Sequence, residues 1–222
     1  MVSKVSSSPY PGVFVTFEGG EGAGKSTQIQ LLAEGLQEAG YRVLLTRQPG
    51  GTGYGKRIRD LILAPAEEEV LSPRAELFLY LADRAHHVDY LVRPALQAGK
   101  VVICDRYTDS TLAYQGYGRG LDLAQLRLLN TAATGDLIPQ LTFWLDLDPE
   151  VGRQRISSRG VLDRLESEAL HFHQAVQAGY ADLAAQSPHR WLKVDALQSV
   201  SDIQALILEQ TLRLLKSSAR FS

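Results

Sequence analysis

The chain has 222 residues, of which 45% are hydrophobic and 22% are charged. This length fits one α/β domain with a sizeable core. The formal net charge of −2 excludes a global basic field that would attract nucleic acid or anionic membranes, so any phosphate site needs a local cluster of cations.

The rest of the composition favours a cytoplasmic protein. The single cysteine, Cys104, cannot form an internal disulfide, which suits a reducing compartment. No apolar run approaches the roughly 18 residues of a membrane span, so no membrane partner is expected. The start of the chain is rich in serine and has no apolar core, so we expect a flexible tail over residues 1–11 and no secretory signal. Residues 12–222 are expected to form one domain.

Short apolar segments predict strands, and the longer segments between them predict helices. The strands are expected at residues 13–17, 42–46, 101–104, 141–145 and 191–194. The helices are expected at residues 26–38, 73–97, 123–133, from 149 towards 159, at 166–185 and at 200–215. The strand segments are almost continuously apolar, as in sheets covered on both faces. The alternation predicts an α/β fold with a parallel sheet flanked by helices on both faces and with ligands at the carboxyl ends of the strands.

The segment after the first strand has the spacing of a phosphate-binding loop. Its residues fit G-x-x-x-x-G-K-[ST] between a strand and a helix. Backbone amides in such a loop converge on phosphates, and the helix N-terminus adds partial positive charge. Lys25 is expected to reach the transferred phosphate, and the Ser26 hydroxyl is expected to bind Mg²⁺. The expected nucleotide-binding residues are Gly19, Gly20, Glu21, Gly22, Ala23, Gly24, Lys25, Ser26 and Thr27.

This loop alone does not distinguish a kinase from a nucleotide-dependent binding switch. A GTPase would need a guanine-reading N-K-x-D sequence, which the chain lacks. Arginines occur instead at the carboxyl ends of strands, namely Arg47 and Arg106, and Arg59 follows in the segment after the second strand. A monophosphate kinase needs such arginines for the acceptor phosphate and needs no general base, because that phosphate is already anionic. Another deoxynucleoside or nucleotide kinase on the same fold remains an alternative.

The helix expected at residues 73–97 carries a ring and a guanidinium on one face. Tyr80 and Arg84 are four residues apart, so they are neighbours on the helix surface. A tyrosine ring can stack on a base while an arginine bonds the edge of the base or a phosphate. The pair therefore predicts part of a nucleotide pocket.

A second arginine cluster follows the fourth strand. Arg153, Arg155 and Arg159 precede Gly160, where the chain can bend. A lid at about residues 153–164 would exclude water and stabilise charge on the transferred phosphoryl group. A charged, solvated helix end is the alternative interpretation of this cluster.

Together these segments resemble the thymidylate kinases of the bacterial type. The matching segments are FEGGEGAGKST, TRQPGGT, AELFLYLADR, DRYTDSTLAYQGYGRG, LDLDPEVGRQRISSRG, LDRLE and the late VDA. They extend from about residue 13 to about residue 215, so nearly the whole chain is covered. The resemblance implies a P-loop fold with a five-stranded parallel sheet, a homodimer, and Mg²⁺-dependent transfer of the γ-phosphate of ATP to dTMP.

The resemblance also implies roles for individual residues. Arg59 and Arg106 would hold the dTMP phosphate, and Glu21 would accept a hydrogen bond from the 3′-hydroxyl of the sugar. Asp105 would lie near the metal with Ser26. The base and sugar pocket would be formed by Tyr80, Arg84, Thr111, Tyr114 and Gln115. The catalytic residues implied are Lys25, Glu21, Arg106, Arg155 and Arg159, with the lid supplying the cation that residues 20–23 lack.

Two positions depart from the usual pattern of this family. Gln48 stands where R-E-P-G-G is common, so a role of that acid in binding metal-bound water does not carry over. Tyr80 stands where phenylalanine usually stacks on thymine, and its hydroxyl needs a partner or water if it is buried.

Overall fold

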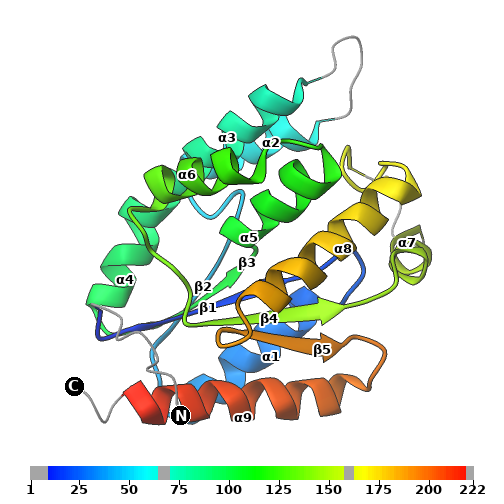
Figure 1. Ribbon diagram of the computed structural model, residues 1–222. Coiled ribbons are helices and arrows are strands. Elements are labelled where there is room, and N and C mark those ends of the chain that lie inside the picture. Colours follow the sequence, from blue (N-terminus) through cyan, green and yellow to red (C-terminus); the bar gives the residue numbers. More distant parts are fainter. Residues whose placement is uncertain (1–9, 65–70, 158–162, 219–222) are drawn as a thin grey trace.

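One parallel sheet lies between two layers of helices in the computed structural model, which describes residues 10–64, 71–157 and 163–218 (Figure 1). The strands are β1 (Val13–Glu18), β2 (Val43–Arg47), β3 (Val101–Asp105), β4 (Leu141–Asp146) and β5 (Trp191–Asp195). Their order is β2-β3-β1-β4-β5, and every neighbouring pair is parallel. The predicted fold class is confirmed, and each strand ends one residue later than predicted.

Helices fill most of the chain between the strands. They are α1 (Lys25–Glu38), α2 (Gly53–Leu63), α3 (Pro73–His87), the π-helix η1 (Val88–Val92), α4 (Arg93–Gln97), α5 (Thr108–Thr111), the π-helix η2 (Leu112–Gly118), α6 (Leu123–Thr134), α7 (Pro149–Ser157), α8 (Leu170–Gln186) and α9 (Val200–Ser218). None of these helices, within the residues described, is long and apolar enough to cross a membrane.

Two differences from the predicted helices have clear physical causes. We did not predict α2, α5 or η2, because glycines in α2 and η2 weaken the helical signal of those segments. The helix predicted at 166–185 begins only at Leu170. The Asp163 carboxylate accepts hydrogen bonds from the backbone amides of Leu165 and Glu166, each at 2.9 Å, and this makes a separate turn before α8. Arg159 and Gly160 lie outside the described residues.

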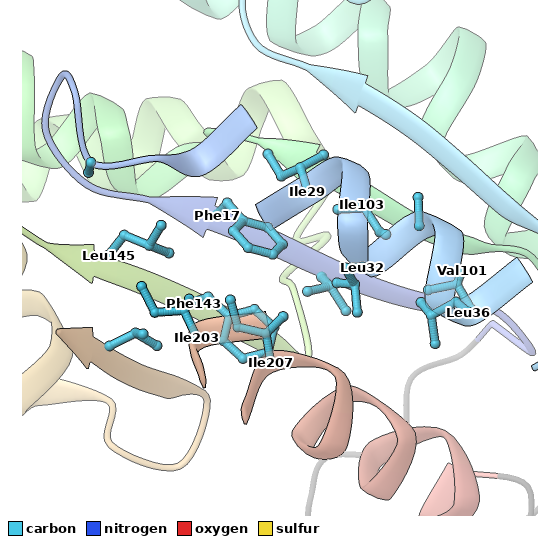
Figure 2. Packing of buried hydrophobic residues seen from close by; sticks show 14 of the residues in the cluster. Phe17, Ile29, Leu32, Leu36, Val101, Ile103, Phe143, Leu145, Ile203 and Ile207 are labelled. Carbon is cyan, nitrogen blue, oxygen red and sulfur yellow. The ribbon is translucent and has the colours of Figure 1, made fainter. Parts of the chain in front are cut away.

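The first face of the sheet packs against α1 and α9. Side chains of β1, β3 and β4 interdigitate there with Leu32 of α1 and Ile207 of α9, all of them buried (Figure 2). Successive residues of β1 alternate between the faces, so Val15 and Phe17 belong to this core while Phe14 packs in a separate cluster with η1 and α4. Both faces are covered, which explains the continuous apolar pattern of the strands.

The second face is covered by α3, η2, α6 and α8, in the upper half of Figure 1. Their shared core includes Leu81, Tyr114, Phe172 and Tyr180 together with Trp144 of β4. This layer brings η2 and α8 against the carboxyl ends of the central strands. The polar residues that follow those strands therefore lie beneath two helices rather than in open solvent.

Helix α7 packs against the loop that follows β1 with almost no space between the two backbones. A Cβ atom on Gly152 would lie 2.4 Å from the carbonyl oxygen of Glu21. A Cβ atom on Gly22, where φ is 71°, would lie 2.6 Å from the carbonyl oxygen of Gly152. Both distances are shorter than nonbonded atoms tolerate, so the contact requires glycine on each side.

We expect Gly152→Ala to lower the melting temperature by several degrees. Overpacking of this kind costs about 1–3 kcal/mol, although alanine is otherwise the better helix former by about 1 kcal/mol. Gly53→Ala is the control, because a Cβ atom there meets nothing within 4 Å. Thermal unfolding followed by circular dichroism measures both variants. Melting temperatures that are equal for Gly152→Ala and the parent would show that α7 does not press on the loop.

Candidate active site

The loop between β1 and α1 has the backbone of a phosphate cradle. Gly19 has φ 133°, and a Cβ atom there would lie 2.4 Å from the carbonyl oxygen of Leu145, so no other residue fits. Gly24 precedes α1 in the left-handed conformation, with φ 87°. The Lys25 ammonium donates to the carbonyl oxygens of Gly19 at 3.1 Å and Gly20 at 2.8 Å. The lysine therefore lies along the loop, and α1 directs its N-terminus at the same place.

Ser26 and Asp105 line one hollow of about 350 Å³ beside this loop, together with residues of β2 and the turn that follows it. The Oδ1 atom of Asp105 is buried and accepts no hydrogen bond from the residues described. Mg²⁺ in phosphoryl-transfer sites is held by one or two protein oxygens together with the substrate phosphates and water. A hydroxyl and an unpartnered carboxylate oxygen in one hollow fit that ion. No cluster of three or more His, Cys, Asp or Glu residues suited to a metal occurs in the described part of the chain.

Arg106 is held in a strained conformation at the end of β3. Its φ of 66° lies in the left-handed region, which is uncommon for a residue with a side chain. Its guanidinium donates to the carbonyl oxygen of Gly19 at 2.9 Å, to Glu21 Oε1 at 2.5 Å and to the Tyr180 hydroxyl at 3.2 Å. It also lies 4.9 Å from the centre of the Tyr114 ring. These contacts fix a cation directly against the phosphate loop.

Glu21 pairs with this cation, and its carboxylate oxygen lies 2.5 Å from the Arg106 guanidinium. Burial raises the pKa of its carboxyl group, but the charges of Arg106 and Lys25 outweigh burial and bring the pKa to about 2. The Tyr114 hydroxyl donates a further hydrogen bond to Glu21 at 3.2 Å. Glu21 is therefore ionised at neutral pH and can accept a hydrogen bond, but it is a weak base.

A pocket of about 100 Å³ opens beside Glu21 and Arg106. Every residue predicted for the acceptor lines it, namely Glu21, Arg59, Tyr80, Arg84, Arg106, Thr111, Tyr114 and Gln115. Residues at the end of the predicted lid and directly after it also line the pocket, at positions 163, 165 and 166. The structure thus brings together side chains from the loop, α2, α3, the end of β3, α5 and η2.

Arg84 forms the floor of this pocket, although its side chain is almost completely buried. Its Nε–H donates to Gln48 Oε1 at 2.8 Å. One terminal nitrogen donates to Thr111 Oγ1 and to Asn130 Oδ1, each at 2.6 Å, and the other donates to the carbonyl oxygen of Tyr107 at 3.0 Å. A guanidinium has five N–H donors, so one remains available to a ligand.

Gln48, one of the two departures from the family pattern, links Arg84 to His87. The Gln48 amide nitrogen lies 2.8 Å from His87 Nδ1, and His87 Nε2 lies 2.6 Å from Thr46 Oγ1. Burial and the charge of Arg84 lower the pKa of His87 to about 4. A neutral imidazole accepts from Gln48 at Nδ1 and donates to Thr46 at Nε2. Tyr80, the second departure, lines the pocket, and burial and the charge of Glu76 raise the pKa of its hydroxyl above the ordinary value.

Two of the three predicted lid arginines lie in the described part of the chain. Arg155 donates to the carbonyl oxygen of Gly22 at 3.2 Å and approaches that of Ala196 at 3.5 Å. Arg153 lines a small pocket of about 20 Å³ together with Glu21 and His173. Arg155 therefore contacts the phosphate loop and Arg153 lines a pocket beside it, while their role in transfer stays a prediction. Arg159 was predicted to act with them and lies outside the described residues.

Glu18, a carboxylate at the strand end to which the sequence assigned no role, shares the Ser110 and Tyr180 hydroxyls with Arg106. Glu18 is completely buried, and it accepts hydrogen bonds from the Tyr107 amide at 2.8 Å, the Ser110 hydroxyl at 2.5 Å and the Tyr180 hydroxyl at 2.9 Å. Burial and the charge of Asp109 raise its pKa. An acid directly after an apolar strand was a usable signal. No signal in the sequence pointed to Tyr180, which is 162 positions away.

Glu76 was not predicted from the sequence. Its side chain is 1% exposed and pairs with Arg119 and Arg164. Glu76, Tyr80 and Arg84 follow one another at intervals of four residues on α3. That spacing places all three on one helix face, so the segment AELFLYLADR contained the signal.

We expect His87 to make the protein less stable as the pH falls from 6.5 towards 4. In that range the unfolded chain takes up a proton at His87 and the folded chain does not, so the free energy of unfolding decreases as the pH falls. The whole shift corresponds to about 3 kcal/mol. The free energy of unfolding, measured by urea unfolding at several pH values, should depend less steeply on pH for His87→Gln than for the parent. His189→Gln, at an exposed position, is the control. Equal slopes for the parent and His87→Gln would contradict this expectation.

Comparisons with known proteins agree with this geometry. The family model described as thymidylate kinase matches residues 17–207. A thymidylate kinase of Synechococcus sp. (strain JA-2-3B'a(2-13)) is 55% identical over 193 residues, which cover 87% of this chain and 91% of the relative. One of Exiguobacterium sp. is 48% identical over 205 residues, or 92% and 96% of the two chains.

Comparison of the fold with solved structures finds the same group of proteins. The crystal structure of thymidylate kinase from Ehrlichia chaffeensis superposes with a TM-score of 0.73 at 34% identity, over 90% of this chain and 98% of that one. The phosphate loop, the adjoining acceptor pocket and the sequence relatives all lead to one conclusion. The chain belongs to the thymidylate kinase family and is a kinase.

Proposed function

We propose that this chain transfers the γ-phosphate of ATP to dTMP, giving dTDP and ADP for dTTP synthesis. The observation that carries this proposal is a single pocket that joins the guanidinium of Arg106, at the phosphate loop, to a polar floor at Arg84, Thr111 and Gln115. Arg106 contacts both the phosphate loop and the pocket, through Gly19 and Glu21. Donor and acceptor sites that share one cation suit direct transfer between two bound phosphates.

On the donor side, loop residues 19–27 would bind the phosphates of ATP, with Lys25 neutralising their charge. Ser26 and Asp105 would hold Mg²⁺ in the hollow that they share. The ion, when bound, neutralises charge on the phosphate oxygens. Arg153, Arg155 and Arg159 would stabilise the phosphoryl group during transfer, and the contact between Arg155 and the Gly22 carbonyl supports this role.

On the acceptor side, Arg59 and Arg106 would bind the dTMP phosphate. Glu21 would accept a hydrogen bond from the 3′-hydroxyl, and Tyr114, which bonds Glu21, would crowd the 2′ position. Tyr80 would stack on the base. Arg84 would donate its remaining N–H to a carbonyl oxygen of the base, beside Thr111 and Gln115.

A deoxynucleoside kinase is the nearest alternative, and the electrostatics disfavour it. Such an enzyme needs a general base that deprotonates a sugar hydroxyl, with a pKa near the working pH. Glu21 is the carboxylate that the loop contributes to this pocket, and its pKa of about 2 makes it a poor base. An acceptor that is already an anionic phosphate needs no base, and it uses the arginines.

We also propose a cytoplasmic homodimer. Large apolar side chains are exposed on α2, α3 and η1, at Tyr54, Leu61, Phe78 and Tyr90. An apolar face of this kind is typical of a protein interface. Cys104 is buried and reduced, as suits the cytoplasm. No nucleic acid is proposed as a partner, because the net charge is −2.

The proposed reaction predicts phosphate transfer from ATP to dTMP and none to thymidine. Lys25→Met should remove most of this transfer while the circular dichroism spectrum stays that of the parent, because the variant loses the loop cation. A coupled assay of ADP release with dTMP, dUMP, dCMP and thymidine measures the acceptor range. Transfer to thymidine, or a folded Lys25→Met variant with the parent rate, would contradict the assignment.

The proposed acceptor site predicts that Arg106→Ala binds dTMP about 10- to 100-fold more weakly. This range corresponds to the loss of hydrogen bonds from a charged donor. Titration calorimetry with dTMP and with ATP separates the two sites, and ATP affinity should change much less. Arg57→Ala, at an exposed position on α2, is the control. Equal losses for both nucleotides would count against Arg106 as an acceptor residue.

A further inference from the structure

The buried carboxylate of Glu76 has its two oxygen atoms committed to different partners. Oε2 accepts from a terminal nitrogen of Arg164 at 2.5 Å and from one of Arg119 at 3.3 Å. Oε1 accepts from the Gln115 amide nitrogen at 2.8 Å, with Arg119 Nε at the longer distance of 3.4 Å. Two arginines therefore hold one oxygen, and a glutamine holds the other.

This arrangement allows only one orientation of the Gln115 amide. Burial raises the pKa of Glu76, but the hydrogen bonds from Gln115 and Arg164 outweigh it and lower the pKa, so the carboxylate is ionised and accepts only. Gln115 must present its NH₂ group to Glu76. Its carbonyl oxygen bonds no donor among the residues described, and Gln115 lines the acceptor pocket. The side-chain carbonyl oxygen of Gln115 is therefore available as a hydrogen-bond acceptor in the pocket.

A hydrogen-bond acceptor distinguishes between pyrimidine bases. Thymine and uracil carry an N–H donor at ring position 3, whereas cytosine has a lone pair there. A carbonyl oxygen bonds the former and repels the latter. We propose that Glu76 is a positioning residue that makes the pocket select bases with an N–H at position 3, because it fixes the orientation of the Gln115 amide. This inference rests on the proposed function and adds the origin of its base selectivity.

The substitution Glu76→Gln should turn the Gln115 amide over, rather than only make its orientation less fixed. Arg119 and Arg164 still need an acceptor, so the remaining oxygen of the new amide lies at the position of Oε2. Its NH₂ group then lies at the position of Oε1 and faces Gln115. Two NH₂ groups cannot bond each other, so Gln115 turns over and presents its own NH₂ group to the pocket. A donor at that point favours the lone pair of cytosine.

Dissociation constants of dTMP, dUMP and dCMP, measured by calorimetry on the parent and on Glu76→Gln, test this proposal. We expect dTMP and dUMP to bind about 10- to 100-fold more weakly to the variant, as for a buried donor left without a partner. The affinity for dCMP should stay the same or rise, and the affinity for ATP should not change. If Glu76 had only a structural role, the variant would bind all of these nucleotides more weakly.

A matched control removes a neighbouring charge without touching Gln115. Glu168 pairs with Arg119 at 2.6 Å, so Glu168→Gln makes the same change of charge in the same cluster. It should keep the parent preference for dTMP. The exchange variant Glu76→Gln/Gln115→Glu should also restore the preference, because the new carboxylate at 115 accepts from the amide at 76 and still offers an oxygen to the base.

The outcomes separate this proposal from the proposed function. If Glu76→Gln folds and keeps the parent ratio of dTMP to dCMP affinity, the proposal is overturned, while phosphate transfer to dTMP stands. If Glu76→Gln does not fold, the exchange variant decides: a restored preference supports the proposal, and a folded exchange variant without it overturns the proposal. A parent that transfers no phosphate to dTMP refutes the proposed function, and the three affinities still test the orientation of Gln115.

Discussion

The burial of opposite charges beneath the carboxyl ends of β1 and β3 constrains the whole site. Glu18 is completely buried, and Arg106 packs above it in a left-handed conformation. The Tyr180 hydroxyl bonds both, donating to Glu18 at 2.9 Å and accepting from Arg106 at 3.2 Å. An unpaired buried charge is strongly destabilising, so α8 must dock where Tyr180 reaches both groups. The position of α8 in turn fixes Arg106, which lines the acceptor pocket.

The features predicted correctly from the sequence are those that neighbouring residues encode. The nearly continuous apolar pattern of residues 13–17, and the glycine spacing after it, depend on adjacent residues, so β1 was predicted to within one residue and the loop after it was placed correctly. The hydrogen bond between Glu18 and Tyr180 joins residues 162 positions apart and leaves no periodic trace. Helix η2 was missed because its i→i+5 turns and its glycines, such as Gly116, do not give the usual helical pattern.

The two partners of Gln48 explain why a glutamine, rather than a glutamate, suits position 48. Gln48 accepts from Arg84 and lies 2.8 Å from the Nδ1 atom of His87, whose pKa of about 4 keeps the ring neutral. An amide can accept from the arginine and donate to the imidazole at the same time, whereas a carboxylate can only accept. A glutamate at this position would need His87 to present an N–H. Residue 48 and the tautomer of His87 therefore depend on each other, and the sequence pattern of residues 46–52 alone does not reveal this.

The polar groups of the acceptor pocket are held in position by hydrogen bonds to the protein itself. Glu76 fixes the Gln115 amide, and Arg84 uses four of its five N–H donors on the protein itself. Buried ion clusters such as Glu76 with Arg119 and Arg164 seldom increase stability over a well-packed apolar core, because the charges lose their hydration. Dipoles that are oriented before the ligand arrives need no reorganisation when it binds, and a base with the wrong donor pattern leaves them unpaired. Selection among bases, rather than stability, is therefore the physical reason to keep three charged side chains in the interior behind this pocket.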